Sequence, residues 1–577
     1  MIRLSSCPKH YTADQDKVMT PSETVARVKA RLAELDTHIL AETRRIDTGR
    51  LGIPVFLSVC GEDARRFMPT RKQMGKGASV EQAEASALME LMERYSYWTF
   101  WDRKPDMVRC TWSQAVKRFG DKLVGLDVIL HSVSETLPHD NAARIMDLTE
   151  WWFCPATDIH SGEERIIPLD WFRKLGEFNG SSAGNTDEES IFQGACELVE
   201  RHVCCVIDRA CKPVPTISPA SFTDPVLVNL YSKFTDNGIV VILKDFSQGM
   251  PVPTVAAIAW DPATFPYQSE IVYTAGTASS PVKAAGRALT EVAQLAGDFE
   301  SGACYEASGL PKYARTEELG WLLEGPEVNL DELPSVEHGD IYEELMSLVR
   351  GLHTQGYSLY SVQTTNPELN VSANYNLVPG FQFRERDKNA SLGLFVGRIL
   401  SEECDAQTAA QGLSVLEEIY PHAHFLPFFK GMLALRAEAF DEACLLFEQA
   451  EPLQPEADAK GLAAFYSGYC HTLKEDWRAA LPGLDRAVAL CPEMKEYFNF
   501  RGVTRFKLGM YAEAAEDFRT LIKDLDKGSA IDLANLGLCC KFLGQREEAE
   551  EYLTAALDID PSIGFAREHL AELKQER

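Results

Sequence analysis

The spacing of apolar and polar positions divides the chain into two regions of different character. Up to about residue 404, apolar runs of strand length, such as 239–243 and 255–260, alternate with stretches in which apolar residues recur every three or four positions. This alternation is typical of a mixed α/β domain. From about residue 405 only the helical period remains. We therefore predict a mixed α/β domain over residues 1–404, followed by an all-α domain over residues 405–577.

Within the first region the pattern predicts individual elements. A helix begins after the Thr-Pro-Ser-Glu sequence at 20–23, and the spacing of Val25, Val28, Leu32 and Leu40 extends it to about residue 44. Further helices are expected over residues 79–101, 225–235, 282–299 and 341–353. A glycine-rich loop is expected over residues 179–186, followed by a helix that extends to about residue 201. Further strands are expected over residues 53–59, 151–153, 166–169, 239–243, 255–260 and 357–365. The proline- and acid-rich segment 317–340 is expected to be a loop or a lid.

The second region contains an internal repeat. Glycines recur at intervals of 37, 34 and 35 residues, at Gly431, Gly468, Gly502 and Gly537. Alanines recur at the same intervals, at Ala443, Ala480, Ala514 and Ala549. A period near 34 is the signature of tetratricopeptide repeats, which stack helix pairs into a curved surface that usually binds a protein or peptide. We expect a protein partner here. The alternative is a repeat that only packs on the first domain or joins two chains in a homodimer.

Composition and charge narrow the partners and the compartment. The net charge of −29 argues against nucleic acid and anionic membranes as partners. No apolar run approaches membrane-spanning length, and the amino terminus lacks a signal-peptide pattern. The 15 cysteines form no CxxC pair and no cysteine–histidine motif with metal-site spacing. We therefore expect a cytoplasmic protein with reduced thiols and no zinc site.

Three predicted helices carry the same kind of side-chain pair. Each places an acid and a second oxygen ligand three residues apart, and so on one helix face. The pairs are Glu90 and Glu93, Glu197 and Glu200, and Glu291 and Gln294. Five carboxylates in one place would repel one another, and a hard divalent cation such as Mg²⁺ offsets that repulsion. The alternative is three solvated helix faces with ordinary acid–arginine pairs.

Other residues near these helices suit phosphate. Lys76 lies between two glycines just before a predicted helix, where backbone N–H groups attract anions. No GxxxxGK[ST] sequence can be found in the chain. Arg287 lies four residues before Glu291 and so on the same helix face, a spacing at which the two side chains can form an ordinary ion pair.

These segments resemble a known family. The segments at 75–96 (GKGAS…SALMELMERYS), 179–201 (NGSSAGNT…ELVER) and 287–294 (RALTEVAQ) are similar to the three nucleotide-binding helices of the YcaO family, and the resemblance covers about the first 400 residues. It implies binding of ATP and Mg²⁺ without a P-loop, with Mg²⁺ held by Glu90, Glu93, Glu197, Glu200 and Glu291. It implies catalytic roles for the first four of these acids and for Arg201 and Arg287. The residues expected to bind the nucleotide are Lys17, Thr24, Lys76, Ser86, Asn179, Asn185, Glu189, Gln193, Glu291 and Gln294.

The resemblance also implies an activity. Members of the family activate a backbone amide of a peptide or protein, whose oxygen attacks the γ-phosphoryl group of ATP. A side-chain nucleophile then gives an azoline, and an external sulfur donor gives a thioamide. Azoline-forming members commonly end in a proline-rich tail, whereas this sequence ends Lys574-Gln-Glu-Arg577, which leaves the product open. The alternative function is an accessory factor for methylthiolation of a ribosomal protein, in which the repeats recruit a partner and the ATP domain is regulatory.

Overall fold

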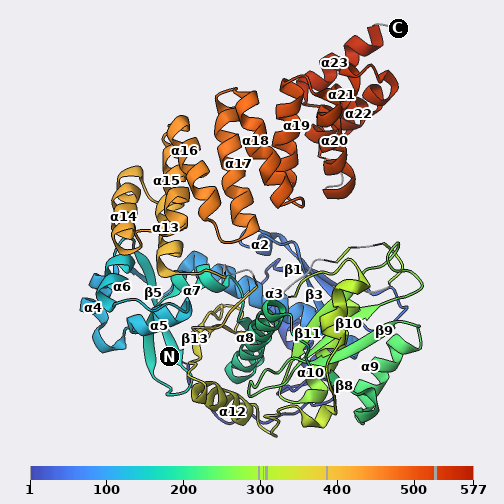
Figure 1. The fold of residues 1–577 in the computed structure, drawn as a ribbon. Helices are drawn as coiled ribbons and strands as arrows, with labels where there is room; N and C mark the ends of the chain where they lie inside the picture. Colours follow the sequence, from blue (N-terminus) through green and yellow to red (C-terminus); the bar gives the residue numbers. More distant parts are fainter. Residues whose placement is uncertain are drawn as a thin grey trace. The chain divides into compact units, whose positions relative to one another are not determined.

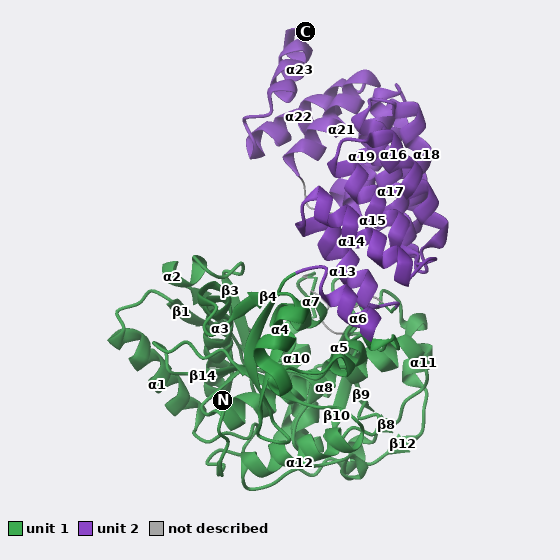
Figure 2. Cartoon of the chain, turned by 90° about the vertical axis from the view of Figure 1, so that its left-hand side faces the viewer, with its two compact units in different colours: residues 1–139, 150–388 green, residues 140–149, 389–577 purple. Residues whose placement is uncertain are grey.

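The chain divides into two compact units. The computed structural model describes residues 2–296, 299–302, 304–305, 310–384, 388–525 and 529–575. One unit consists of residues 1–139 and 150–388, and the other of residues 140–149 and 389–577 (Figure 2). Helix α13 (Leu392–Glu403) therefore belongs to the second unit, although it precedes the boundary expected at residue 404. Most of α6 (His139–Met146) also belongs to the second unit.

The described residues of the first unit form three sheets (Figure 1). One has the strand order β1 (Leu40–Arg45), β2 (Val55–Cys60), β3 (Lys72–Lys76). The second has the order β11 (Val272–Thr277), β10 (Thr254–Trp260), β9 (Val240–Asp245), β8 (Thr216–Ile217), β12 (Glu327–Val328). The third has the order β4 (Val108–Cys110), β5 (Trp151–Asp158), β13 (Tyr360–Gln363), β14 (Ser372–Leu377), β7 (Ser181–Gly184), with β6 (Glu164–Pro168) paired to β5.

An edge strand of each sheet leads into a long helix. Strand β3 precedes α3 (Val80–Arg103), β7 precedes α8 (Asp187–Ala210), and β11 precedes α10 (Pro281–Ala296). A glycine in each strand permits close packing, because a Cβ atom on Gly75, Gly184 or Gly276 would lie 2.0, 2.5 or 2.5 Å from a backbone nitrogen of the following helix. Gly75 and Lys76 therefore lie in a strand packed on α3, rather than in the turn that the sequence suggested.

The five-stranded sheet is buried on both faces. On one face Ala256 and Ile258 of β10 pack in a core shared with α8 and α12 (Ile341–Thr354). On the other face Val255 and Ala257 pack with α9 (Pro225–Thr235) and α10. Burial of alternate residues on opposite faces explains why this strand is an unbroken apolar run in the sequence.

Most of the long predicted elements are confirmed, but the end of the first helix and the loop expected over segment 317–340 are wrong. Helix α1 (Pro21–Glu34) begins with the predicted cap at Thr20 but ends ten residues earlier than expected, because Asp36 adopts a φ of 50° and the chain then forms β1. Segment 317–340 is not simply a loop, since it contains α11 (Gly320–Leu323) and β12, which pairs with β8. Five short helices were not predicted: α2 (Glu62–Arg65), α4 (Trp112–Phe119), α5 (Leu126–Ser132), α6 and α7 (Leu169–Gly176).

The second unit is a row of paired helices (Figure 1). After α13 these are α14 (Ala406–Ile419), α15 (Phe425–Arg436), α16 (Phe440–Ala450), α17 (Ala457–Leu473), α18 (Trp477–Leu490), α19 (Lys495–Lys507), α20 (Tyr511–Thr520), α21 (Ala530–Phe542), α22 (Arg546–Ile559) and α23 (Gly564–Gln575).

The packing of the helix pairs explains the glycine repeat. A Cβ atom on Gly431 would lie 2.9 Å from the ring of Phe447 on the next helix, and Gly502 has the same relation to Phe518 at 2.8 Å. The repeated alanines on the second helices are fully buried. Among the described helices of both units, none has the length and apolar character needed to cross a bilayer.

Candidate functional site

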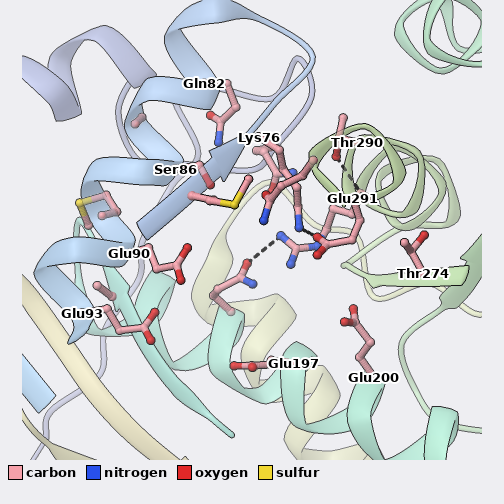
Figure 3. Close-up of a pocket in the computed structure, with 18 of the residues that line it drawn as sticks. Lys76, Gln82, Ser86, Glu90, Glu93, Glu197, Glu200, Thr274, Thr290 and Glu291 are labelled. Carbon is pink, nitrogen blue, oxygen red and sulfur yellow. Dashed lines mark hydrogen bonds and ion pairs between the residues drawn. The ribbon is translucent and has the colours of Figure 1, made fainter. Parts of the chain in front are cut away.

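The three strand–helix pairs of the first unit surround one cavity of about 380 Å³ (Figure 3). Helices α3, α8 and α10 line it, together with β3, β7, β11 and the segment around Lys17. All the predicted site residues except Asn179 line this cavity. They are Lys17, Thr24, Lys76, Ser86, Glu90, Glu93, Asn185, Glu189, Gln193, Glu197, Glu200, Arg201, Arg287, Glu291 and Gln294.

Six carboxylates line this cavity among the described residues, and five of them are the predicted metal ligands. Glu90 and Glu93 come from α3, Glu197 and Glu200 from α8, and Glu291 from α10 (Figure 3). The pKa of Glu93 is raised to about 8, mainly by burial; Arg94 opposes the shift, and the carboxylates of Glu197 and Glu90 add to it. Burial likewise raises the pKa of Glu90 and of Glu200. The cavity is therefore a place where negative charge is unfavourable until a cation enters it.

Cationic side chains lie beside these acids. Nη1 of Arg94 is 3.3 Å from Oε1 of Glu93, and Nη2 of Arg201 is 3.8 Å from Oε1 of Glu197. Lys76 forms an ion pair with Glu291, also drawn in Figure 3. Burial lowers the pKa of Lys76 to about 7, and the charge of Arg287 lowers it too.

Two buried guanidinium groups keep unused donors. Nη1 of Arg287 donates to Oε1 of Gln193 at 3.2 Å, so the Arg287–Glu291 ion pair allowed by the spacing is not what these described residues form. The Nε atoms of Arg201 and Arg287 are buried, and neither has a hydrogen-bond partner among the described residues. Buried donors without acceptors are unfavourable unless a ligand supplies the acceptor, and an anion does so best.

A hydrogen-bond network holds the amino-terminal segment against the start of α8. Nζ of Lys17 is 3.4 Å from Oε1 of Glu189, whose Oε2 accepts the backbone N–H of Val18 at 3.2 Å. Oγ1 of Thr24 donates to Oδ1 of Asn185 at 3.2 Å, and Nδ2 of Asn185 donates to Glu189 at 3.1 Å. Lys17 and Thr24 thus reach the cavity because Glu189 and Asn185 position their segment.

Asn179 is the exception. It lines a separate small cavity with Tyr375 and Asn376, whereas Asn185 lines the large one. Strand β7 runs between the two asparagines, and a strand advances by about 3.3 Å per residue. The two ends of this segment therefore cannot reach the same ligand atoms.

The cavity also has lining residues that sequence reasoning did not single out. They are Gln15, Pro21, Met74, Gln82, Ala85, Met89, Arg94, Ala183, Cys204, Tyr273, Thr274, Ala275, Thr290, Leu295 and Leu310. Gln82 precedes Ser86 by four residues and Arg94 follows Glu90 by four, so helical spacing could have identified both. The strand residues, such as Met74 and Thr274, carry no such signal in one sequence.

Comparisons with known proteins agree with this architecture. A family model described as the ATP- and Mg²⁺-binding YcaO cyclodehydratase matches residues 74–382, more than half of the chain. A tetratricopeptide-repeat model matches residues 533–563. An uncharacterized protein of Methanothermobacter thermautotrophicus is 27% identical over 391 residues, which covers 63% of this chain and 95% of that protein.

Two solved structures share the fold. A heterocyclase in complex with substrate and cofactor superposes with a TM-score of 0.53 at 21% identity, over 66% of this chain and 54% of its own length. A YcaO protein from Methanopyrus kandleri, bound with AMPPCP and Mg²⁺, gives a TM-score of 0.50 at 22% identity, over 67% of this chain and 100% of its own. The predicted fold, a mixed α/β unit followed by tetratricopeptide-type helices, is confirmed. ATP and Mg²⁺, the cofactors expected from the sequence, are those of the matching family, and by the extent of that match the chain belongs to the YcaO family.

Proposed function

We propose that the first unit uses ATP and Mg²⁺ to activate a backbone amide of a peptide or protein. The observation that carries this proposal is the composition of the cavity, where the five predicted metal-ligand carboxylates face the same space as the guanidinium groups of Arg201 and Arg287, whose Nε donors are buried and unused among the described residues. Carboxylates suit Mg²⁺, and guanidinium N–H groups suit phosphate. The residues present therefore fit both components of a magnesium nucleotide.

Each group has a distinct part in this proposal. Glu90, Glu93, Glu197, Glu200 and Glu291 would hold Mg²⁺. Arg201, Arg287, Lys17 and Lys76 would bind phosphate oxygens and orient them. When bound, ATP supplies the γ-phosphoryl group that makes the amide oxygen a leaving group, so that a nucleophile can attack the amide carbon. Such phosphoryl transfer depends on positioning and charge neutralisation more than on covalent help from the protein.

The nucleophile decides the product. A cysteine, serine or threonine side chain of the substrate would give an azoline, and a sulfur donor would give a thioamide. The second unit would then recruit a protein partner, as tetratricopeptide repeats commonly do. An accessory role in ribosomal-protein methylthiolation differs from this proposal in one respect, namely that ATP use by the first unit would then regulate the partner rather than modify a bound peptide.

Nucleotide binding by the full chain tests the proposal. Calorimetry should show ATP binding in Mg²⁺ that is lost in EDTA. Arg287→Lys keeps the charge but removes the Nε donor, and loss of a hydrogen bond to a charged group lowers affinity by about 10- to 100-fold. The same change at the exposed Arg315 is the matched control.

Two results would contradict the proposal. One is equal, negligible heat in Mg²⁺ and in EDTA. The other is unaltered affinity in the Arg287→Lys protein. Mass spectrometry of peptides incubated with the protein and ATP would then separate the products, because a thioamide, an azoline and an unmodified amide differ in mass.

A further inference from the structure

A second group of ligand-type side chains lies far along the sequence, within the repeat unit. Cys444 and Glu448 are one turn apart on α16, and His471 is in the last turn of α17. Sγ of Cys444 is 3.0 Å from Nε2 of His471 and 3.7 Å from Oε1 of Glu448. One ligand atom from each of the three residues lies within 4.8 Å of the other two. This sulfur, nitrogen and oxygen set has no role in the ATP cavity.

Repeat packing does not account for these residues. Cys444 follows the repeated alanine Ala443, and the corresponding positions in the later repeats hold Leu481, Ala515 and Glu550. His471 lies three residues after Gly468, where the later repeats have Arg505 and Cys540. The cysteine–histidine combination is thus specific to this pair of helices.

The side chains are arranged so that their polar atoms converge. Cys444 is only 7% exposed as a residue and packs against Ser467 of α17, with Sγ 3.6 Å from the hydroxyl oxygen. Nδ1 of His471 is buried with no hydrogen-bond partner among the described residues, so Nε2 is the ring nitrogen that faces a polar neighbour. Lys474, the nearby cation, forms an ion pair with Asp441, which offsets its charge.

We propose that Cys444, Glu448 and His471 bind a zinc ion. Tetrahedral Zn²⁺ with ordinary bond lengths separates a sulfur and a nitrogen ligand by about 3.5 Å, so small side-chain movements complete the site. Mg²⁺ prefers oxygen ligands, and the thiol and imidazole therefore select a softer cation than the ATP cavity does. Glu448 is exposed, so the fourth coordination position opens to solvent.

The site is hidden in the sequence because its ligands come from two helices. The cysteine and the histidine are 27 residues apart, and no short motif links them. The sequence analysis expected no zinc site because it found no cysteine–histidine motif, and the present proposal departs from that expectation. An open fourth position can take water, or a donor side chain of a partner bound to the repeats, which would make partner binding depend on zinc.

Titration of the full-length, metal-free protein with Co²⁺ tests this site. Cobalt bound to a thiolate gives a sulfur-to-metal charge-transfer band in the near ultraviolet, whereas cobalt bound to carboxylates does not. We expect about one equivalent of Co²⁺ to give the band and Zn²⁺ to displace it. Cys444→Ser should abolish the band. Glu448→Gln should keep the band but weaken Co²⁺ binding. The loss of affinity should exceed the roughly 10- to 100-fold effect that is typical when a group beside the metal ligands, rather than a ligand itself, is changed.

Cys540→Ser is the matched control, because Sγ of Cys540 lies 3.9 Å from Oε2 of Glu548 in the same unit but has no imidazole hydrogen-bond partner within the part of the chain that the structure describes. This variant should keep the band. His471→Gln gives a second loss-of-ligand variant, and circular dichroism checks that each variant is folded. Absence of the band in the wild-type protein, or its persistence in folded Cys444→Ser or His471→Gln, would overturn the proposal. Cobalt bound without the band would mean that the metal occupies carboxylates only, which also rejects it.

Discussion

Replacing Glu93 by glutamine is expected to stabilise the protein in the absence of metal and nucleotide. Burial, assisted by Glu197 and Glu90, raises the pKa of Glu93 from 4.5 to about 8. At pH 7 the unfolded chain therefore carries an ionised Glu93, and folding must place a proton on it. Glutamine is neutral in both states and has nearly the same shape, so the variant avoids this cost.

The size of this stabilisation and its pH dependence both follow from the raised pKa of Glu93. The folded protein binds more protons than the unfolded chain between pH 4.5 and 8, so the Glu93 carboxyl lowers the free energy of unfolding as the pH rises through that window. At pH 7 the effect is about 3 kcal/mol, from 1.36 kcal/mol per pH unit above 4.5. The side chain is only 14% exposed, so solvent screening reduces this value little.

Thermal unfolding of the full chain across pH 5 to 8, without metal or nucleotide, measures the difference. We expect the melting temperature of Glu93→Gln to exceed that of wild type by an amount that grows with pH and is small near pH 5. The exposed Glu368 supplies the control, and Glu368→Gln should show no such trend. With ATP and Mg²⁺ the wild type should gain more than the variant, because the amide is a poorer metal ligand. A variant that is no more stable than wild type at pH 8, or a gain independent of pH, would refute the reasoning.

Two further predictions concern the carboxylate of Glu200 and the glycines Gly276 and Gly286. Glu200→Gln should reduce ATP turnover about 100- to 1000-fold in a phosphate-release assay, because one electrostatic stabiliser of the developing charge is lost, and turnover near the wild-type rate would remove Glu200 from the metal site. Gly276→Ala should lower stability by about 1–3 kcal/mol, since the added Cβ would lie 2.5 Å from the backbone nitrogen of Ala288. Gly286→Ala lies in α10 itself, where the nearest neighbour of the added Cβ is at 3.8 Å, and it should instead stabilise by about 0.5–1 kcal/mol in the same unfolding assay. An equal effect of both changes would contradict the packing argument.

The local periodicity of apolar residues explains which parts of the fold could be predicted from the sequence. The long helices and the central strands were predicted because their faces are buried along their whole length, as in β10 and α9. The edge strand β1 was mistaken for the end of a helix because it is mostly exposed and has no apolar alternation. The assignment of residues 140–149 to the second unit depends on contacts remote in sequence, which no local pattern contains.

The same distinction applies to the site. Each acid pair was visible because residues three apart share a helix face, as Glu197 and Glu200 do. The meeting of three helices at one cavity was suggested by the recurrence of this spacing in three helices and by the resemblance to a family, because spacing within one helix does not fix the distance to another. Asn179 was misplaced for a related reason, because the sequence of a glycine-rich loop does not reveal that a strand separates its two ends.

The attachment of α3, α8 and α10 to three different sheets has a mechanical consequence. No single sheet fixes the distance between the acid pairs, so that distance depends on how three separately hydrogen-bonded pieces of the first unit fit together. A cation shared by carboxylates of α3 and α8 would act as a reversible cross-link between pieces remote in sequence, much as a disulfide joins distant segments. The rigidity of the whole unit would then depend on the concentrations of metal and nucleotide. The bound metal nucleotide would hold the three helices in position as well as take part in the reaction.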